Sequence, residues 1–352
     1  MSVSNRDVGR IERSRATSVR SSPFHNSHWM VALGGAVSLL LSGAQSSQGQ
    51  SPPERLWSEC ATGGTAVSGL CADAALALQA LHSGMGGLLA AGGPLPTGPS
   101  TLGHRTEGSP RIVVDVGAGW ASFKHPDLSR RPGGDGSGRE ARSTPLSGRL
   151  TGVVGVFPGF SPLPTVGGVL SLDAVVMLQA VGVPSSPASP GTRFGWGAGV
   201  RAGVFRESFS LPGVTLSATH HRMGELSYGL PEGPGALATL SPRMTSLRLT
   251  AGKELWPIGV SGGVGWDRYR GDGRIMARSE EGAAPQTTRR RDLEMDRRYL
   301  FGGVSYTWLV TQVAAEFTWA RAATPLAELD GTSSFEPGGG ELQGAVSFRI
   351  RY

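Results

Sequence analysis

The side chains that could do chemistry in this 352-residue sequence are single charged residues set into stretches of alternating apolar and small residues. In an extended strand successive side chains point to opposite faces, so each of these charges lies opposite the apolar face. Charges of both signs on the inner face of a closed sheet must pair, because an unpaired buried charge is costly. We therefore expect a network that seals the interior; the alternative is that the same residues line a path for a solute or ligand. The candidates are Asp115, Asp173, Arg193, Arg201, Arg248, Asp267, Glu316, Arg349 and Arg351.

Other reactive residues show no spacing that predicts catalysis. His220 and His221 are adjacent, so on a strand they point to opposite faces and cannot share one site. The sequence has no G-x-S-x-G elbow and no Ser, His and Asp arrangement with a usable spacing. We therefore predict neither an enzymatic activity nor a cofactor.

The two cysteines, Cys60 and Cys71, follow a segment that has the layout of a secretory signal. An arginine-bearing region precedes the apolar run WMVALGGAVSLLLS at 29–42, and small residues then precede Gln45. The run is shorter than the roughly 20 residues of a transmembrane helix, so residues 1–44 are predicted to be a signal peptide, although the long basic region leaves a later start codon open. Export would bring the cysteines into an oxidising compartment, which favours a disulfide between them. Two cysteines cannot form a zinc tetrad, and no metal site is predicted.

From residue 111 to the end, the sequence alternates with a period of two, which predicts ten strands. In the last of them Leu342, Val346, Phe348 and Ile350 share a face, and the stretch ends on the aromatic Tyr352. The ten ranges are 111–123, 149–157, 169–181, 193–206, 214–226, 244–252, 257–269, 298–310, 312–321 and 341–352.

The connections between these stretches alternate in length. Short turns are predicted near 208–213, 252–257 and 310–311, and long loops at 124–148, 229–243, 271–296 and 322–340. The connection at 183–192 is intermediate, and 158–168 is long where a short turn is expected. Short periplasmic turns alternating with long external loops are typical of a membrane barrel. The aromatic residues that would form its interfacial girdles lie on the apolar faces, mostly near strand ends: Trp120, Trp196, Trp266, Trp308, Trp319 and Tyr352.

The strand alternation, the loop lengths, the aromatic end and the signal together resemble bacterial outer-membrane β-barrel proteins over residues 111–352. The resemblance implies an all-β fold, a transmembrane antiparallel up-and-down barrel of about ten strands (range 8–12). It also implies an outer membrane of the Gram-negative type, contact with its lipid and lipopolysaccharide, and recognition of the last strand by the barrel-assembly machinery. A looser resemblance, by architecture alone, is to plugged barrels of the long-chain fatty-acid transporter type, which have more strands. The alternative fold is a secreted soluble barrel or sandwich.

Residues 45–110 have no strand partner in this scheme. The lead-in at 45–71 is polar and irregular, and 72–92 favours a helix that Gly84, Gly86 and Gly87 would end or kink. An apolar helix in water would expose its leucines, so we expect it either to find a periplasmic partner or to plug the lumen, where it would meet the charges.

Composition narrows the choice of partners. Charged residues make up 17%, against about 25% in a typical soluble protein. About half of the net charge of +6 comes from the N-terminal arginines, so nucleic-acid binding is not predicted. Basic residues in or beside a predicted external loop could bind lipopolysaccharide phosphates, or they could simply be solvated. They are Arg289, Arg290, Arg291, Arg297 and Arg298.

The predicted function is a structural barrel, or one that passes or binds a small solute. The alternatives are a transporter for apolar ligands, a barrel for adhesion or envelope anchoring, and a secreted soluble binding protein.

Overall fold

The computed structural model of the protein describes residues 52–63, 65–102, 111–130, 140–161, 168–189, 191–209, 211–320 and 341–351. The predicted signal at 1–44, the predicted loop at 322–340 and Tyr352 lie outside the described residues. Neither helix among the described residues combines the length and apolarity that a membrane crossing requires.

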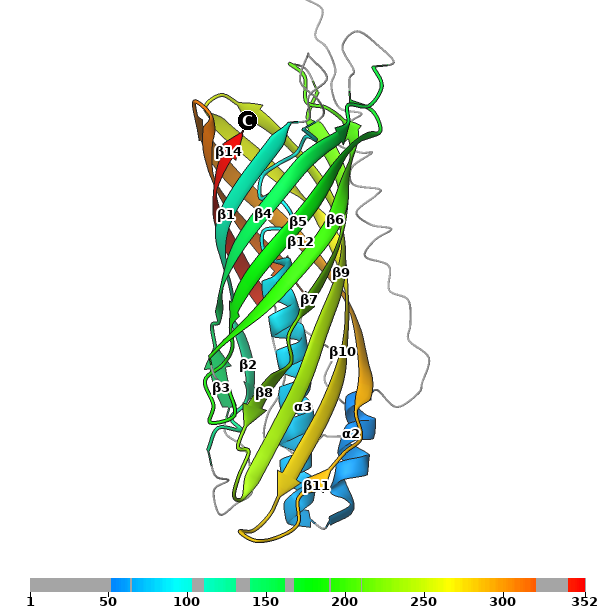
Figure 1. Ribbon diagram of the computed structural model, residues 1–352, viewed down its shortest axis with the longest axis vertical. Helices are drawn as coiled ribbons and strands as arrows, with labels where there is room; N and C mark the ends of the chain where they lie inside the picture. The colour runs from blue at the N-terminus through cyan, green and yellow to red at the C-terminus, as the bar shows by residue number, and fades with distance from the viewer. Residues whose placement is uncertain are drawn as a thin grey trace, which may run out of the picture. The chain divides into compact units, whose positions relative to one another are not determined.

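Ten strands close into one antiparallel barrel (Figure 1), because each pairs with its neighbours along the chain and the first pairs with the last. All ten predicted strands are present, so the prediction of a ten-stranded up-and-down barrel is confirmed. The barrel strands are β1 (Ile112–Ala121), β4 (Leu146–Phe157), β5 (Ser171–Gly182), β6 (Thr192–Phe205), β7 (Gly213–Met223), β9 (Gly235–Leu255), β10 (Ile258–Arg278), β12 (Arg291–Trp308), β13 (Thr311–Ala320) and β14 (Glu341–Arg351).

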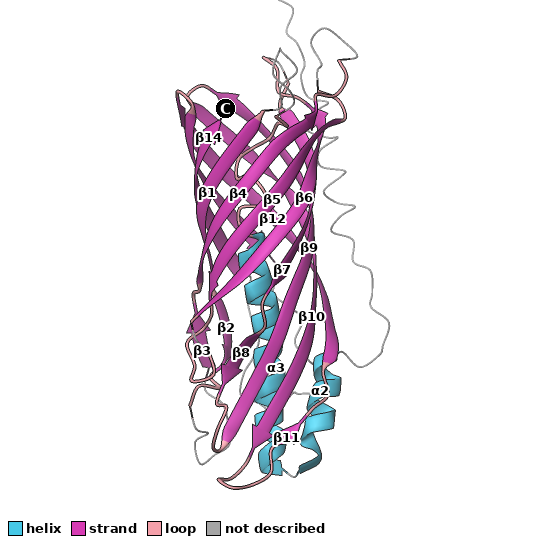
Figure 2. Ribbon diagram, in the orientation of Figure 1, coloured by secondary structure: helices cyan, strands magenta, loops and turns pink. Residues whose placement is uncertain are grey.

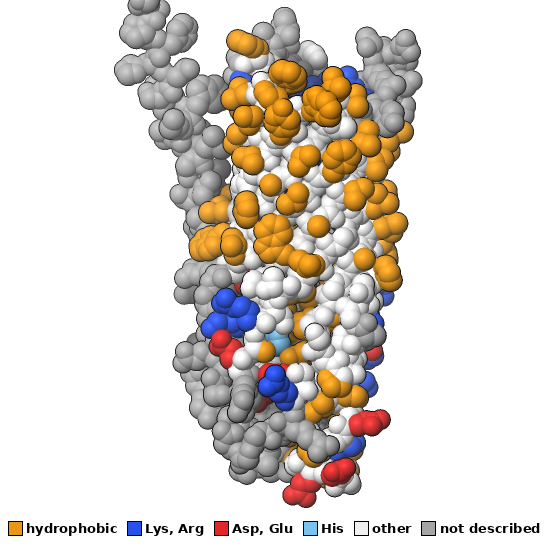
Figure 3. All heavy atoms as spheres, turned by 90° about the vertical axis from the view of Figure 1, so that its left-hand side faces the viewer, with side chains coloured by type: hydrophobic (Ala, Val, Ile, Leu, Met, Phe, Trp, Pro, Cys, Tyr) orange, Lys and Arg blue, Asp and Glu red, His pale blue; other side chains and the backbone are white. Residues whose placement is uncertain are grey.

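Over much of its length the barrel is apolar outside and polar inside. On β1, Val114 and Val116 are exposed while Asp115 between them is fully buried. A band of hydrophobic side chains covers the outer surface in Figure 3, whereas the interior holds serine, threonine and ion-paired residues. A soluble barrel has the opposite arrangement, so this surface is one that faces lipid. The barrel therefore spans a membrane.

The two ends of the barrel differ in their connections. We call the end with the turns at 256–257 and 309–310 the short-turn end; β1 begins there, beside the end of β14. The opposite, long-loop end carries a small hairpin, β2 (Phe123–Pro126) with β3 (Glu140–Ser143), and the short strands β8 (Leu226–Gly229) and β11 (Gln286–Thr287). The described ends of the connection after β4, residues 158–161 and 168–170, lie at the short-turn end, where Phe160 and Val169 form a bridge.

The predicted loops at 229–243 and 271–296 are largely wrong, because β9, β10 and β12 continue through most of these residues. Beyond Trp266 the two faces exchange polarity. Tyr269, Ile275 and Leu293 point inward and are buried, while charged residues such as Arg270 and Glu294 point outward. This part of the sheet behaves like soluble protein, because an apolar helix inside it provides the core.

That helix is α3 (Thr65–Ala90), which lies inside the barrel (Figure 2) and contacts β9 and β10 most extensively. It is preceded by α2 (Pro52–Cys60) and the short 3-10 helix η1 (Ala61–Gly63), and a disulfide joins Cys60 to Cys71. Leucines of α3 pack with Tyr269, Ile275 and Leu293 in one hydrophobic cluster.

The glycines of α3 do not end it. A Cβ added at Gly84 would overlap the ring of Phe123, and one added at Gly86 would overlap Tyr269. The missing side chains therefore make room for aromatic rings from the surrounding sheet. The helix ends only at Ala90, where Gly92 and Gly93 take positive φ angles of 75° and 53°.

Candidate functional site

After α3 the chain continues through the lumen as an irregular stretch, residues 91–102, which we call the lumen segment. The amide of Gly93 donates to the carbonyl of Ala90 at 2.9 Å and closes the helix. Leu95 and Thr97 are buried, and the hydroxyl of Thr101 contacts Ser171, the first residue of β5. The lumen segment therefore reaches the short-turn end, where β1 begins.

Three buried arginines from different strands hold the backbone of the lumen segment. Arg149 on β4 donates to the carbonyl of Ala91 at 2.7 Å, and Arg349 on β14 donates to that of Pro96 at 2.6 Å. Arg201 on β6 donates to two carbonyls, Gly98 at 2.6 Å and Ser100 at 3.0 Å. We call Arg149, Arg201 and Arg349 the arginine clamp. Hydrogen bonds from a charged donor are stronger than neutral ones, so the clamp fixes the segment at several points.

Acidic residues on adjacent strands compensate two of the three clamp arginines. Arg201 pairs with Asp173 at 3.3 Å, and Arg349 pairs with Asp115 at 3.2 Å. Asp173 also accepts a hydrogen bond from the amide of Leu102 at 3.0 Å, so it holds the lumen segment directly. A further buried pair, Arg248 with Glu316, lies in the same half of the lumen. Ion pairs thus neutralise Arg201 and Arg349, and Arg149 is held by its hydrogen bond to the carbonyl of Ala91.

The structure brings together most of the predicted interior charges. Arg193 has the inward phase but lies half-buried at the rim, where it donates to the carbonyl of Glu225 at 2.7 Å. The side chain of Arg351 lies outside the described residues. The seven that are buried inside the barrel are Asp115, Asp173, Arg201, Arg248, Asp267, Glu316 and Arg349.

Two interior arginines are missing from the prediction. Arg149 points inward on β4, like Thr151 two residues later. It is the first residue of the predicted strand 149–157, where the alternation gives the weakest indication of direction. Arg297 is predicted to lie in or beside the external loop at 271–296, whereas it is buried on β12 in an ion pair with Glu341 at 2.9 Å. The continuing phase toward Tyr299 could have indicated its place.

The paired histidines, the basic loop residues and the tryptophans can also be placed in the structure. His220 is exposed and His221 is buried, so the two histidines do face opposite sides. Arg290 and Arg291 form ion pairs with Glu225 at 2.5 Å and Glu59 at 3.3 Å. The predicted girdle residues Trp120, Trp196, Trp266, Trp308 and Trp319 all lie on the outer face of the barrel.

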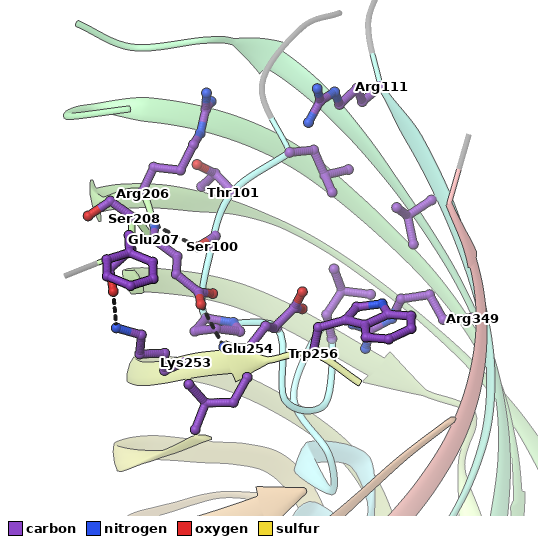
Figure 4. A pocket seen from close by; sticks show the side chains of 17 residues that line it. Ser100, Thr101, Arg111, Arg206, Glu207, Ser208, Lys253, Glu254, Trp256 and Arg349 are labelled. Atoms are coloured by element: carbon purple, nitrogen blue, oxygen red, sulfur yellow. Dashed lines mark hydrogen bonds between the residues drawn. The ribbon is translucent and has the colours of Figure 1, made fainter. Parts of the chain in front are cut away.

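At the short-turn end the lumen opens into a cavity of about 1120 Å³ (Figure 4), which we call the vestibule. The lumen segment forms one wall, and the amide of Glu207 donates to the hydroxyl of Ser100 at 3.1 Å. Lys253, Glu254 and Trp256 also line the cavity. The vestibule is lined by residues of both charge signs, among them Arg349 of the arginine clamp.

A histidine is buried at the long-loop end, in the β2–β3 hairpin. His125 bonds the hydroxyl of Ser143 through Nε2 at 2.7 Å and the carbonyl of Pro126 through Nδ1 at 2.9 Å. Its ring lies edge-on to Tyr228, with the centroids 4.9 Å apart. Burial lowers the pKa of His125 below its usual 6.5, so the ring is neutral at neutral pH. Across the described ranges, His, Cys, Asp and Glu side chains nowhere gather in the groups of three or more that would hold a metal ion.

The sequence matches no protein-family model, and no curated protein is similar enough to indicate common ancestry. Solved structures with a similar fold are bacterial outer-membrane barrels. The translocator domain of the autotransporter NalP from Neisseria meningitidis has a TM-score of 0.41 and 10% identity, over 71% of this chain and 91% of that one. The outer-membrane protease OmpT from Escherichia coli has a TM-score of 0.32 and 10% identity, over 69% of this chain and 96% of that one. The toluene transporter TodX from Pseudomonas putida has a TM-score of 0.27 and 8% identity, over 68% of this chain and 89% of that one. The closed antiparallel barrel and its apolar outer surface make the chain a transmembrane β-barrel protein, the class found in bacterial outer membranes.

Proposed function

We propose that this protein is a sealed outer-membrane barrel that holds its own N-terminal segment across the lumen and presents helix α2, joined by the disulfide to the start of α3, at the cell surface. In outer-membrane barrels the short turns face the periplasm and the long loops face outward. Helix α3 enters from the long-loop end, and β1 begins at the short-turn end. The chain therefore crosses the barrel once before its first strand.

The arginine clamp is the observation that carries this proposal. Arg149, Arg201 and Arg349 occupy backbone carbonyls that water would otherwise solvate, and each is at most 7% exposed. An α-helix with its side chains is about 10–12 Å wide, so α3 fills a narrow barrel. A solute could pass only if several charge-assisted hydrogen bonds broke and the helix moved. The arrangement favours a seal over an open pore.

Export by residues 1–44 would agree with this orientation. With cleavage before Gln45, residues 45–51 would precede α2, and the presented element would be α2, joined by the disulfide to the start of α3. Membrane insertion through the last strand remains a prediction of the same scheme.

The orientation is tested with an epitope inserted after Gly63, between η1 and α3, in intact cells. The matched control carries the same epitope in the short turn at 309–310. We expect antibody to bind the first protein on intact cells and the second only after the outer membrane is permeabilised. The reverse pattern would place the helices in the periplasm and refute the proposal.

A second candidate function is binding of a small polar solute in the vestibule, which its volume of about 1120 Å³ and its mixed charges favour. Lys253→Gln changes the wall without touching the clamp. Loss of a solute-induced thermal shift in this variant, with the sealed lumen unchanged, would support this function.

A further inference from the structure

We infer that the barrel binds the phosphate groups of an anionic lipid at one side of its long-loop rim, through four outward-facing arginines on neighbouring strands. We call Arg222 on β7, Arg243 on β9, Arg268 on β10 and Arg298 on β12 the arginine belt. The inference rests on the proposed orientation, with the long-loop end at the outer leaflet, but not on a sealed lumen. Lipid binding in detergent is measured without that orientation, so the two proposals can fail separately.

The belt lies at the edge of the apolar band. Arg222 is the direct cross-strand partner of Trp196, and Arg298 is that of Trp266. The guanidinium of Arg268 lies 5.1 Å from the ring centroid of Trp266. Tryptophans in membrane proteins concentrate at the interface with water. Guanidinium groups beside them therefore lie at the depth of the lipid headgroups, where phosphates are found.

The charges of the belt are only partly balanced within the protein. Arg222 and Arg243 are direct partners on adjacent strands, and like charges in that position repel. Arg243 forms an ion pair with Asp272 at 3.3 Å, and Arg268 forms one with Asp296 at 3.0 Å. Within the described residues, no carboxylate lies within ion-pair distance of Arg222. An anion bound between the strands would remove the repulsion.

The belt is confined to one side of the barrel. At the same edge of the apolar band, β1, β4, β6 and β13 carry apolar residues that point outward. These are Trp120, Leu146, Trp196 and Trp319. The contrast indicates a local site and not a general attraction to an anionic surface.

Exposed leucines farther along the same strands favour a lipid over a free anion. Leu216 on β7 and Leu247 on β9 are 47% and 40% exposed on the lipid-facing surface, within the same strands as Arg222 and Arg243. Acyl chains can cover these leucines while a phosphate lies between the guanidinium groups, which bind its oxygens in pairs. The expected ligand is a phosphorylated glycolipid of the outer leaflet, such as the lipid A part of lipopolysaccharide.

Binding of purified lipid A to the full-length protein in detergent tests the inference, with native mass spectrometry as the readout. The variant Arg222→Gln with Arg298→Gln removes two belt charges. The control, Arg274→Gln with Arg289→Gln, removes two arginines farther from the apolar band. We expect the belt variant to bind about tenfold more weakly, a typical effect of losing charge-assisted hydrogen bonds, and the control to bind like the wild type.

Two further probes make the outcome decisive. Dephosphorylated lipid A should bind the wild type as weakly as phosphorylated lipid A binds the belt variant, and inorganic phosphate should not compete at the same concentration. Equal binding by both variants, or no difference between the two lipids, would overturn the inference. Competition by inorganic phosphate would also overturn it, because the site would then be one for a free anion. Unchanged heat-modifiable gel migration verifies that each variant is folded.

Discussion

Asp173 and Arg201 are direct partners on β5 and β6, 3.3 Å apart, and both bind the lumen segment. Arg201 donates to the carbonyls of Gly98 and Ser100, and Asp173 accepts from the amide of Leu102. This one ion pair thus holds the lumen segment at both ends of the stretch from Gly98 to Leu102. A buried ion pair adds little net stability against apolar neighbours, but removing one partner leaves a costly charge. Its role here is to position the segment.

Replacing both members of this pair should open the lumen without unfolding the barrel. We expect Asp173→Asn with Arg201→Gln to raise single-channel conductance in a planar bilayer above that of the sealed wild type. Arg201→Gln alone should cost more stability, about 3–5 kcal/mol, because it leaves the Asp173 carboxylate buried and unpaired.

The exposed pair Lys124 and Glu140, 2.8 Å apart, provides the matched control. Lys124→Gln with Glu140→Gln also removes one charge of each sign, and it should leave conductance unchanged. If the Asp173 and Arg201 double variant were as closed as this control, this ion pair would not be needed for the seal, and α3 with Arg149 and Arg349 would be sufficient to close the lumen.

Gly84 is predicted to be a packing residue. A glycine-to-alanine change inside a helix usually stabilises it by about 0.5–1 kcal/mol. Gly84→Ala should instead lower the temperature at which the folded barrel form is lost on gels, because the new methyl group overlaps the Phe123 ring. Adding Phe123→Leu should restore part of the loss. Stabilisation by Gly84→Ala alone would mean that the ring is not held against the helix.

Much of the barrel could be predicted because lipid and lumen impose alternation on every strand. Asp115 between Val114 and Val116 shows the pattern, and the same phase placed Asp173, Arg201 and Arg349 inside. The extended parts of β9, β10 and β12 could not be recognised in this way. Beyond Trp266 the apolar residues face inward, so a rule that expects them outward interprets charged residues such as Arg270 as loop.

The assembly of the clamp could not be predicted at all. Arg149, Arg201 and Arg349 are far apart in the sequence, and they meet only because the barrel closes around residues 91–102. Their common target is a set of backbone carbonyls, which have no signature in side-chain type. The prediction that glycines end or kink α3 was wrong for a related reason, because the role of Gly84 and Gly86 depends on aromatic rings that come from β2 and β10.

The lipid-facing surface provides a third prediction. Val264 on β10 points outward within the apolar band, and Met276 points outward on the same strand beyond Trp266. Val264→Arg should cost roughly 2–4 kcal/mol of unfolding free energy if it lies near the bilayer midplane. Met276→Arg adds the same side chain outside the band and should cost little. Folding titrations in lipid vesicles measure both, and similar costs would mean that the edge of the band is misplaced.

Loss of the disulfide should loosen the helices at the long-loop end and spare the barrel. Cys60 and Cys71 are 11 residues apart, and a loop of this size contributes about 3 kcal/mol in the chain-entropy description. We expect Cys60→Ser with Cys71→Ser to make α2 sensitive to protease while heat-modifiable migration of the barrel persists. Resistance of α2 equal to that of the wild type would show that its contacts with β10 and β12 are sufficient.

The β2–β3 hairpin should open more readily in acid because of His125. Burial lowers its pKa below 6.5, so the opened hairpin binds a proton that the closed one resists. The stabilising effect is therefore complete above pH 6.5 and is lost as the pH falls, by at most about 1.4 kcal/mol per pH unit. Amide hydrogen exchange in β2 and β3, corrected for intrinsic rates, should show less protection at pH 5 than at pH 7.5. His125→Gln keeps a side chain that can bond Ser143 but does not titrate, so its protection should not change with pH. An equal loss of protection in this variant would assign the acid sensitivity to another group.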